Sequence, residues 1–169
     1  MNATIDLWQG TLTMCDILDF RDTLEKEHTV YTLCKYPPKY INSDKQDRYH
    51  FYFRAHDEGT KSWVIAVNHI EELLKEGKNV LLHCVHGRDR TGGVAYVLIR
   101  KHGTYNHEAA ARVMKEVRPS MAKAWDGILE QRRDFYERIL AEAQVYNGHL
   151  VEYFNHETKS ERGIPYKIV

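Results

Sequence analysis

Residues 80–93 read Val-Leu-Leu-His-Cys-Val-His-Gly-Arg-Asp-Arg-Thr-Gly-Gly, and the fold and function of this chain depend on them. The apolar beginning is typical of a buried strand, and apolar residues return at helical spacing after the two glycines. The stretch therefore predicts a strand, a short loop and the first turn of a helix. Such a helix end favours anions, because its first amides lack partners within the helix and the helix dipole adds positive charge there.

Two side chains of this stretch carry the chemistry that the loop predicts. Arg90 adds a planar, permanently charged fork that matches two phosphate oxygens at once. Cys84 ends the strand beside this positive field, which favours the charged form of a thiol, so we expect a thiolate at neutral pH. Gly87 and Gly92 are expected to allow backbone angles that side chains forbid. A thiolate beside a bound phosphate predicts nucleophilic attack on phosphorus.

The motif His83-Cys84-(five residues)-Arg90-Thr91-Gly92 resembles the signature loop of the protein tyrosine phosphatase superfamily, His-Cys-x5-Arg-Ser/Thr-Gly. The resemblance implies that Cys84 attacks phosphorus to form a phosphocysteine, and that the Thr91 hydroxyl helps the sulfur to leave. It also implies that His83 orders the loop without transferring a proton, and that catalysis needs no metal or cofactor. The phosphate-binding loop is then expected to consist of Val85, His86, Gly87, Arg88, Asp89 and Arg90.

The remaining catalytic group is a carboxyl that protonates the leaving oxygen and later activates water. In the family this group is an aspartate on a mobile loop upstream of the cysteine. Asp57 lies 27 residues before Cys84 and is the expected general acid and base. Glu58 is its rival, and Asp44 and Asp47 are weaker candidates. The Trp-Pro-Asp triplet of many relatives is missing here, and a solvated turn that caps the next helix is the other interpretation of this segment.

Cys34 ends another predicted strand. In some relatives a cysteine at this strand end forms a reversible disulfide with the nucleophile under oxidation. The resemblance thus makes Cys34 a possible redox partner of Cys84, and a buried thiol without redox function is the alternative.

The similarity to the compact dual-specificity branch implies a substrate of phosphotyrosine, phosphoserine or phosphothreonine in proteins. Asp89 supports an alternative, because superfamily members that act on phosphoinositides often read Cys-x-x-Gly-x-Asp-Arg-Thr. His86, however, stands where some lipid phosphatases place lysine. A phosphoinositide or inositol phosphate, an RNA 5′-triphosphate end and a rhodanese-type sulfur transfer therefore stay open. Outside the enzymes, the alternative is a phosphate-binding module without turnover.

The remaining chain predicts a single layered α/β domain, in which helices cover a central mixed or parallel sheet, as in dual-specificity phosphatases. Residues 1–144 are assigned to this domain and 145–169 to a polar C-terminal extension of uncertain structure. Gly77 and Gly103 are expected to end helices, and Asn106 to begin one. We expect strands at Ile5–Gly10, Thr29–Cys34, Arg48–Arg54 and Val80–Cys84, and helices at Cys15–Glu27, Trp63–Glu76, from Gly93 to His102, at His107–Val117 and at Ala124–Gln144.

Composition narrows the partners and the compartment. The 169 residues include 24 Lys plus Arg and 24 Asp plus Glu, so no global field recruits nucleic acid or a membrane surface. Three cysteines make no disulfide framework and favour a reducing, cytoplasmic location. We find no signal peptide, no apolar run near the ~20 residues of a membrane span, and no metal-ligand spacing. The oligomeric state is left open.

Overall fold

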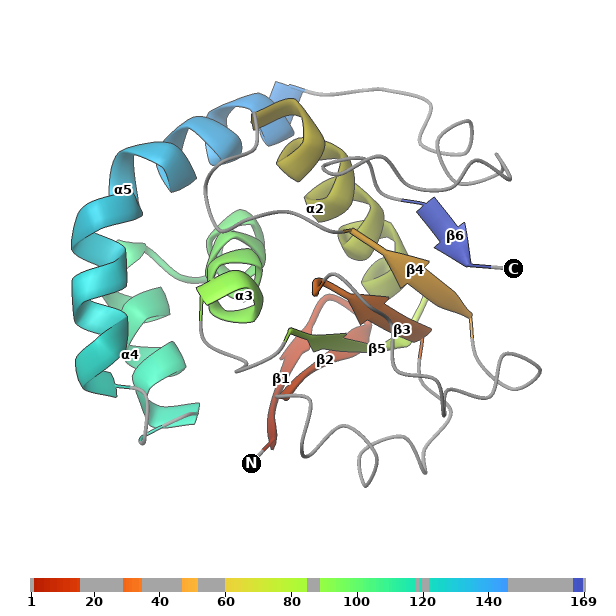
Figure 1. Cartoon of the computed structure of the whole chain (residues 1–169), viewed down its shortest axis with the longest axis horizontal. Coiled ribbons are helices and arrows are strands. Elements are labelled where there is room, and N and C mark those ends of the chain that lie inside the picture. The colour runs from red at the N-terminus through yellow and green to blue at the C-terminus, as the bar shows by residue number, and fades with distance from the viewer. Residues whose placement is uncertain are drawn as a thin grey trace.

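The computed structural model describes residues 2–15, 29–34, 47–51, 60–84, 89–117, 119, 122–145 and 166–168. These residues build a six-stranded sheet in the order β1-β2-β5-β3-β4-β6 (Figure 1). Helices pack against it, which confirms the α/β prediction. The strands are β1 (Asn2–Leu7), β2 (Gly10–Cys15), β3 (Thr29–Thr32), β4 (Arg48–His50), β5 (Asn79–His83) and β6 (Tyr166–Ile168).

The four inner strands are parallel, and the two outer strands are antiparallel to their neighbours. β5 pairs with β2 on one side and β3 on the other, and β3 pairs with β4. The carboxyl ends of these four strands therefore meet at one edge of the sheet, where α/β proteins bind their ligands. Cys84 follows β5 directly and stands at this edge.

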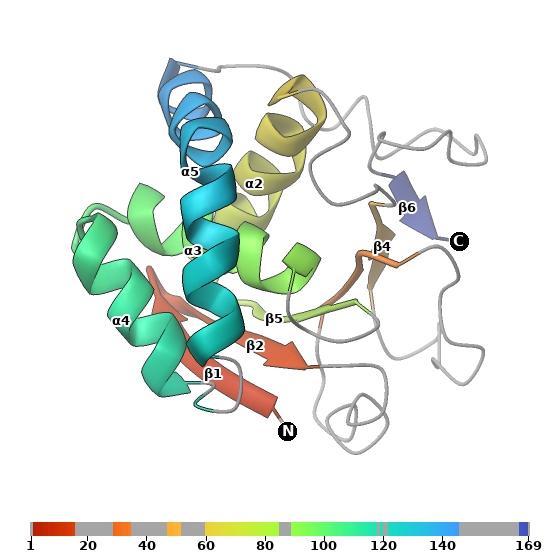
Figure 2. The ribbon, with the colours of Figure 1, turned by 60° about the vertical axis from the view of Figure 1, so that its left-hand side comes forward.

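The described helices are α2 (Thr60–Lys75), α3 (Asp89–Lys101), α4 (His107–Val117) and α5 (Ala122–Val145). α2 and α3 contact β2 and β5, and α5 packs across α2 and α3 (Figures 1 and 2). The core between these layers contains large buried side chains that include Trp63, Tyr96 and Tyr136. The helices thus bury the sheet face that carries Leu82 and Cys84.

Helix ends follow the expected signals. Gly77 and Gly103 follow α2 and α3 with φ of +83° and +86°, values that residues other than glycine rarely adopt. The Asn106 side chain accepts a hydrogen bond from the Ala109 amide at 2.9 Å and caps α4. α3 begins at Asp89, earlier than expected, so Arg90 and Thr91 lie in its first turn.

The N-terminal prediction was wrong in two respects. Gly10 does not close a single strand but begins β2, which pairs with β1 as a hairpin. Trp8, with φ of +55°, occupies the turn. Cys15, expected to start a helix, is the last residue of β2 and lies in register with His83. The rest of the predicted helix Cys15–Glu27 lies outside the described residues.

The C-terminal extension contributes β6. This strand runs antiparallel to β4, with Tyr166 opposite His50 and Ile168 opposite Arg48 (Figure 1). Sequence periodicity gave no sign of this three-residue strand. It adds a sixth strand to the sheet beside β4.

A close contact joins the first turns of α3 to α5. A Cβ on Gly92 would lie 2.9 Å from the Trp125 ring, and one on Gly93 would lie 2.6 Å from the Tyr136 hydroxyl oxygen. Gly92 does not have a positive φ, so the expectation that it allows an unusual backbone angle is wrong. A glycine at this position is explained instead by its close packing against Trp125. The two glycines let α5 rest directly on the helix end that carries Arg90.

Gly93→Ala is expected to lower the free energy of unfolding by about 1 kcal/mol or more, because overpacking (roughly 1–3 kcal/mol) exceeds the gain in helix propensity (roughly 0.5–1 kcal/mol). Gly127→Ala is the matched control. A Cβ at Gly127 meets nothing within 4 Å, so there the propensity gain should appear alone. Urea titration measures both, and a stabilised Gly93→Ala protein would contradict the packing account.

Candidate active site

Cys84 lies at the carboxyl end of β5 with 3% of its surface exposed. β5 is an inner strand, so the cysteine is flanked by the ends of β2 and β3. On the β3 side, the Leu33 amide donates to the His83 carbonyl at 2.8 Å and carries the pairing up to the cysteine. The nucleophile predicted from sequence therefore stands on a rigid part of the sheet.

Arg90 reaches back from α3 to the same edge. Its Nη1 donates to the Leu33 carbonyl at 3.1 Å, although 57 residues separate the two in sequence. A guanidinium has five N–H donors in a fixed fork, so this bond fixes the group and leaves donors for a ligand. Cys84 and Arg90, predicted as partners, are thus both placed at the end of the β5–β3 pair.

His83, directly before the cysteine, is fully buried on the opposite face of β5. Its Nε2 and the Thr32 hydroxyl form a 2.7 Å hydrogen bond to the neighbouring strand. Burial lowers the pKa of His83 to about 4, a hydrogen bond with the Cys84 backbone opposes this shift, and nearby His50 adds to it. The ring is neutral at pH 7, which fits a supporting role better than proton transfer.

This histidine is expected to make the protein less stable in acid. The unfolded chain takes up the His83 proton below about pH 6.5, whereas the folded chain resists it until about pH 4. Stability is therefore present above pH 6.5 and lost as the pH falls toward 4, by up to on the order of 3 kcal/mol. His50, whose pKa burial also lowers, acts in the same direction.

Urea titrations at several pH values test this expectation. His83→Gln cannot titrate, so its unfolding free energy should fall less steeply between pH 6.5 and 4 than that of the wild type. Equal slopes in wild type and His83→Gln would contradict the assignment.

Thr91 lies in the first turn of α3 and is fully buried. Within the described part of the chain its hydroxyl has no hydrogen-bond partner. A buried hydroxyl without a partner costs about 1–3 kcal/mol, so a site that keeps one needs a reason for it. A role toward the sulfur of Cys84 during the reaction offers such a reason and stays a prediction.

Several predicted site residues cannot be placed. Residues 85–88 of the loop lie outside the described part, as do Asp57, Glu58 and Asp44, and Asp89 is placed only as the first residue of α3. Asp47 is described. It precedes β4, at the sheet edge opposite to the one where Cys84 stands.

The redox prediction concerns Cys34. This residue is 2% exposed and follows β3. The strand register places Leu33 beside Cys84 and Cys34 one residue further along. The structure records no disulfide among the described cysteines, so the bond between Cys34 and Cys84 stays a prediction.

Sequence reasoning missed His50, the last residue of β4. It is 3% exposed, and its Nε2 donates to the Cys34 carbonyl at 2.5 Å. The aromatic residues Tyr49 and Phe51 indicate the face of β4 that enters the main core, and His50 lies on the other face. A polar residue at the carboxyl end of an inner strand was the available signal.

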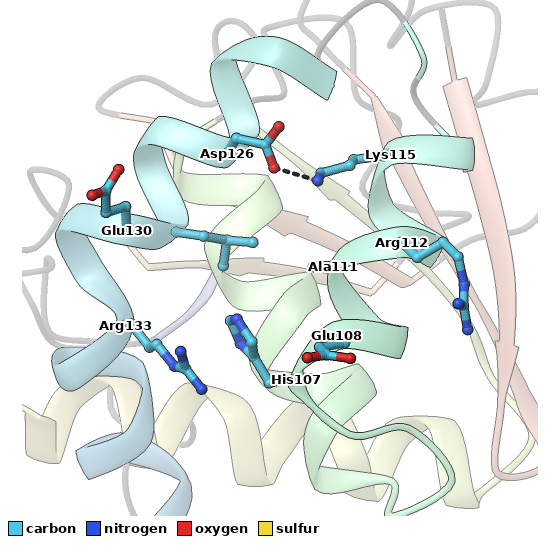
Figure 3. Close-up of a pocket in the computed structure, with 9 residues that line it drawn as sticks. His107, Glu108, Ala111, Arg112, Lys115, Asp126, Glu130 and Arg133 are labelled. Carbon is cyan, nitrogen blue, oxygen red and sulfur yellow. Dashed lines mark ion pairs between the residues drawn. The ribbon is translucent and has the colours of Figure 1, made fainter.

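A pocket of about 580 Å³ lies between α4 and α5 and is separate from these residues (Figure 3). Lys115 and Asp126 form an ion pair across it, and His107 and Arg133 line its other end. His107 Nδ1 is hydrogen-bonded to the Tyr96 hydroxyl of α3. Neither Cys84 nor Arg90 lines this pocket, so it does not contribute to the candidate active site.

Comparisons with known proteins identify the family and the fold of this chain. The sequence profile of the tyrosine phosphatase family matches residues 6–163, and the chain belongs to this family. No curated protein sequence matches it. Among the described helices, none is long and apolar enough to cross a membrane.

Solved structures share the fold at low sequence identity. A mutant form of Tk-PTP is 15% identical, with 80% of this chain and 92% of that chain aligned at a TM-score of 0.59. A variant of P. aeruginosa TpbA in complex with pTyr is 17% identical, with 85% and 92% aligned at 0.56. PTPMT1 in complex with PI(5)P is 14% identical, with 83% and 98% aligned at 0.54. These likenesses confirm the dual-specificity-like fold.

Proposed function

We propose that this member of the tyrosine phosphatase family hydrolyses phosphate monoesters of phosphotyrosine, phosphoserine and phosphothreonine in proteins. The observation that carries the proposal is the pairing of a buried cysteine at the end of β5 with an arginine that is tied to the next strand through the Leu33 carbonyl. The arrangement holds the nucleophile Cys84 and the phosphate-binding side chain of Arg90 in place before the substrate binds, as effective catalysis requires.

The first step forms the phosphocysteine. The Cys84 thiolate attacks phosphorus in line, the sulfur–phosphorus bond forms, and the bond to the leaving oxygen breaks. Asp57 gives its proton to that oxygen, while loop amides and Arg90 bind the three remaining phosphate oxygens, where charge is spread in the transition state.

The second step regenerates the enzyme. Asp57, now a carboxylate, takes a proton from water, and the water oxygen attacks phosphorus as the sulfur–phosphorus bond breaks. The Thr91 hydroxyl donates a hydrogen bond to the departing sulfur, and inorganic phosphate leaves. Neutral His83 holds the strand end through Thr32 and the Cys84 backbone and transfers no proton.

The test is phosphate release by the wild type, without added metal, from a phosphotyrosine peptide, a phosphothreonine peptide, several phosphoinositides and a 5′-triphosphate RNA. Release from both peptides supports the proposal. Release from RNA alone would assign the protein to the RNA 5′-triphosphatases. Binding of vanadate without release from any compound would assign it to the phosphate-binding modules.

A phosphoinositide is the second candidate substrate, because Asp89 completes the Cys-x-x-Gly-x-Asp-Arg-Thr pattern. PTPMT1, which shares the fold, is seen with PI(5)P. His86 lacks the permanent charge of the lysine found in some lipid phosphatases, which favours the protein substrate. A kcat/KM higher for a phosphoinositide than for either peptide would reverse this order.

We also infer reversible protection of the nucleophile by Cys34, in a reducing, cytoplasmic setting. Both thiols are buried at the ends of adjacent strands. Mild peroxide would oxidise the two thiols to one disulfide, with loss of two hydrogen atoms and reduction of peroxide to water. Intact mass of wild type and Cys34→Ser measures it, and no such loss in the wild type would contradict the inference.

A further inference from the structure

His50 is a buried histidine that the proposed mechanism leaves without a role. It ends β4, in register with Thr32 of β3 on one side and Tyr166 of β6 on the other. Its backbone lies in the sheet, and its ring lies on the face that Thr32 and His83 share. The chain continues from this strand end through residues 52–59, the segment that includes Asp57.

The ring of His50 is hydrogen-bonded to the backbone directly after the residue that holds Arg90. The carbonyls of Leu33 and Cys34, two consecutive residues at the end of β3, each accept one side-chain hydrogen bond. Leu33 accepts from Arg90 Nη1 at 3.1 Å, and Cys34 accepts from His50 Nε2 at 2.5 Å. A carbonyl only accepts, so Nε2 carries the hydrogen. The end of β3 therefore links Arg90 to β4, the strand that precedes residues 52–59 and the predicted general acid Asp57.

β6 supports the other side of the same strand. β4 has three residues, so few backbone hydrogen bonds hold it. β6 pairs with all three of them, and it lies beyond residues 6–163, which the family profile matches. β6 thus pairs along the whole of β4, the strand that precedes the segment containing Asp57. His50 lies between the two supports, with the Cys34 carbonyl on one side and Tyr166 on the other.

We propose that His50 is a positioning residue for the general acid: its hydrogen bond to the Cys34 carbonyl, with β6 as an outer clamp, fixes the end of β4 relative to Cys84 and Arg90. The inference rests on the proposed function. Misplacing a catalytic group by about 1 Å can cost on the order of 100-fold, so a single hydrogen bond at the strand end can affect the rate strongly.

The test compares leaving groups. The phenolate of phenyl phosphate is a poor leaving group and needs a proton on its departing oxygen, whereas the para-nitrophenolate of para-nitrophenyl phosphate leaves with little help. A misplaced acid therefore slows hydrolysis of phenyl phosphate much more than hydrolysis of para-nitrophenyl phosphate. In His50→Leu, kcat/KM for phenyl phosphate should fall about ten-fold more than kcat/KM for para-nitrophenyl phosphate. His50→Gln keeps an N–H donor and should restore most of the wild-type ratio. Inhibition by vanadate should not change, because the bond from Arg90 to Leu33 stays intact.

The outcomes separate this inference from the proposed function. Equal losses for both substrates in folded His50→Leu, with an active wild type, would overturn the role of His50 and leave the function standing. No release by the wild type would overturn the function. Should His50→Leu not fold, a chain ending at residue 165 removes β6, and it should show the same selective loss for phenyl phosphate. An unchanged ratio in that chain would reject the proposal.

Discussion

Cys84→Ser should lower phosphate release by roughly four orders of magnitude or more, because a serine hydroxyl at neutral pH is a far weaker nucleophile than a thiolate. The change replaces the sulfur atom with oxygen and leaves the hydrogen bond from Arg90 to the Leu33 carbonyl in place. Phosphate analogues should therefore still bind. Single-turnover release of phosphate from the preferred substrate measures the effect, and displacement of vanadate measures binding.

Cys15→Ser is the matched control for this variant. Cys15 ends β2, next to His83 in register, and packs with Val30 and Leu81 on the other face of the sheet from Cys84. It is buried to a similar degree, so the control reproduces the cost of placing a hydroxyl in the core. Turnover that survives in Cys84→Ser, or disappears in Cys15→Ser while the protein stays folded, would contradict the assignment of the nucleophile.

Asp57→Asn should lower kcat/KM by about 10²- to 10⁴-fold, the range that general acid catalysis contributes. Asparagine has a similar shape but no proton to give to the leaving oxygen. The structure supports the choice indirectly, because residues 52–59 follow β4, whose carboxyl end is at the same sheet edge as Cys84. Because Asp57 must be protonated to act as the acid, the fall of kcat/KM on the alkaline side of the pH–rate profile should disappear in Asp57→Asn.

Glu58→Gln is the matched control for the acid. It changes the neighbouring carboxyl in the same way and should keep most of the activity. The reverse result, with Glu58→Gln inactive and Asp57→Asn active, would move the acid by one residue. Equal and large losses in both variants would indicate that the segment acts as a unit and that neither residue alone is the proton donor.

Local signals predicted much of this fold. The apolar run before Cys84, the helix that follows it, and the caps at Gly77, Gly103 and Asn106 depend on residues close in sequence, and each is present. β2 was missed because Gly10 indicates a turn, and only pairing with β1 and β5 reveals the strand that begins there. β6 depends wholly on distant pairing with β4, which no local pattern encodes.

The site divides in the same way. Cys84 and Arg90 follow from a motif whose members lie six residues apart, so the sequence suffices to predict them. The anchors of the site join distant segments. Arg90 and Leu33 are 57 residues apart, and His50 and Cys34 are 16 apart. Such contacts become visible only when the strand order places β3 between β5 and β4.

The contact between Trp125 and Gly92 gives the protein an intrinsic optical reporter. The indole of Trp125 is 3% exposed and packs against the helix turn that carries Arg90. Indole emission responds to small changes in nearby charge and packing. An oxyanion that binds to the phosphate-binding loop should therefore change the intrinsic tryptophan fluorescence. Ligand binding can then be followed in the unlabelled protein, including inactive variants that release no product.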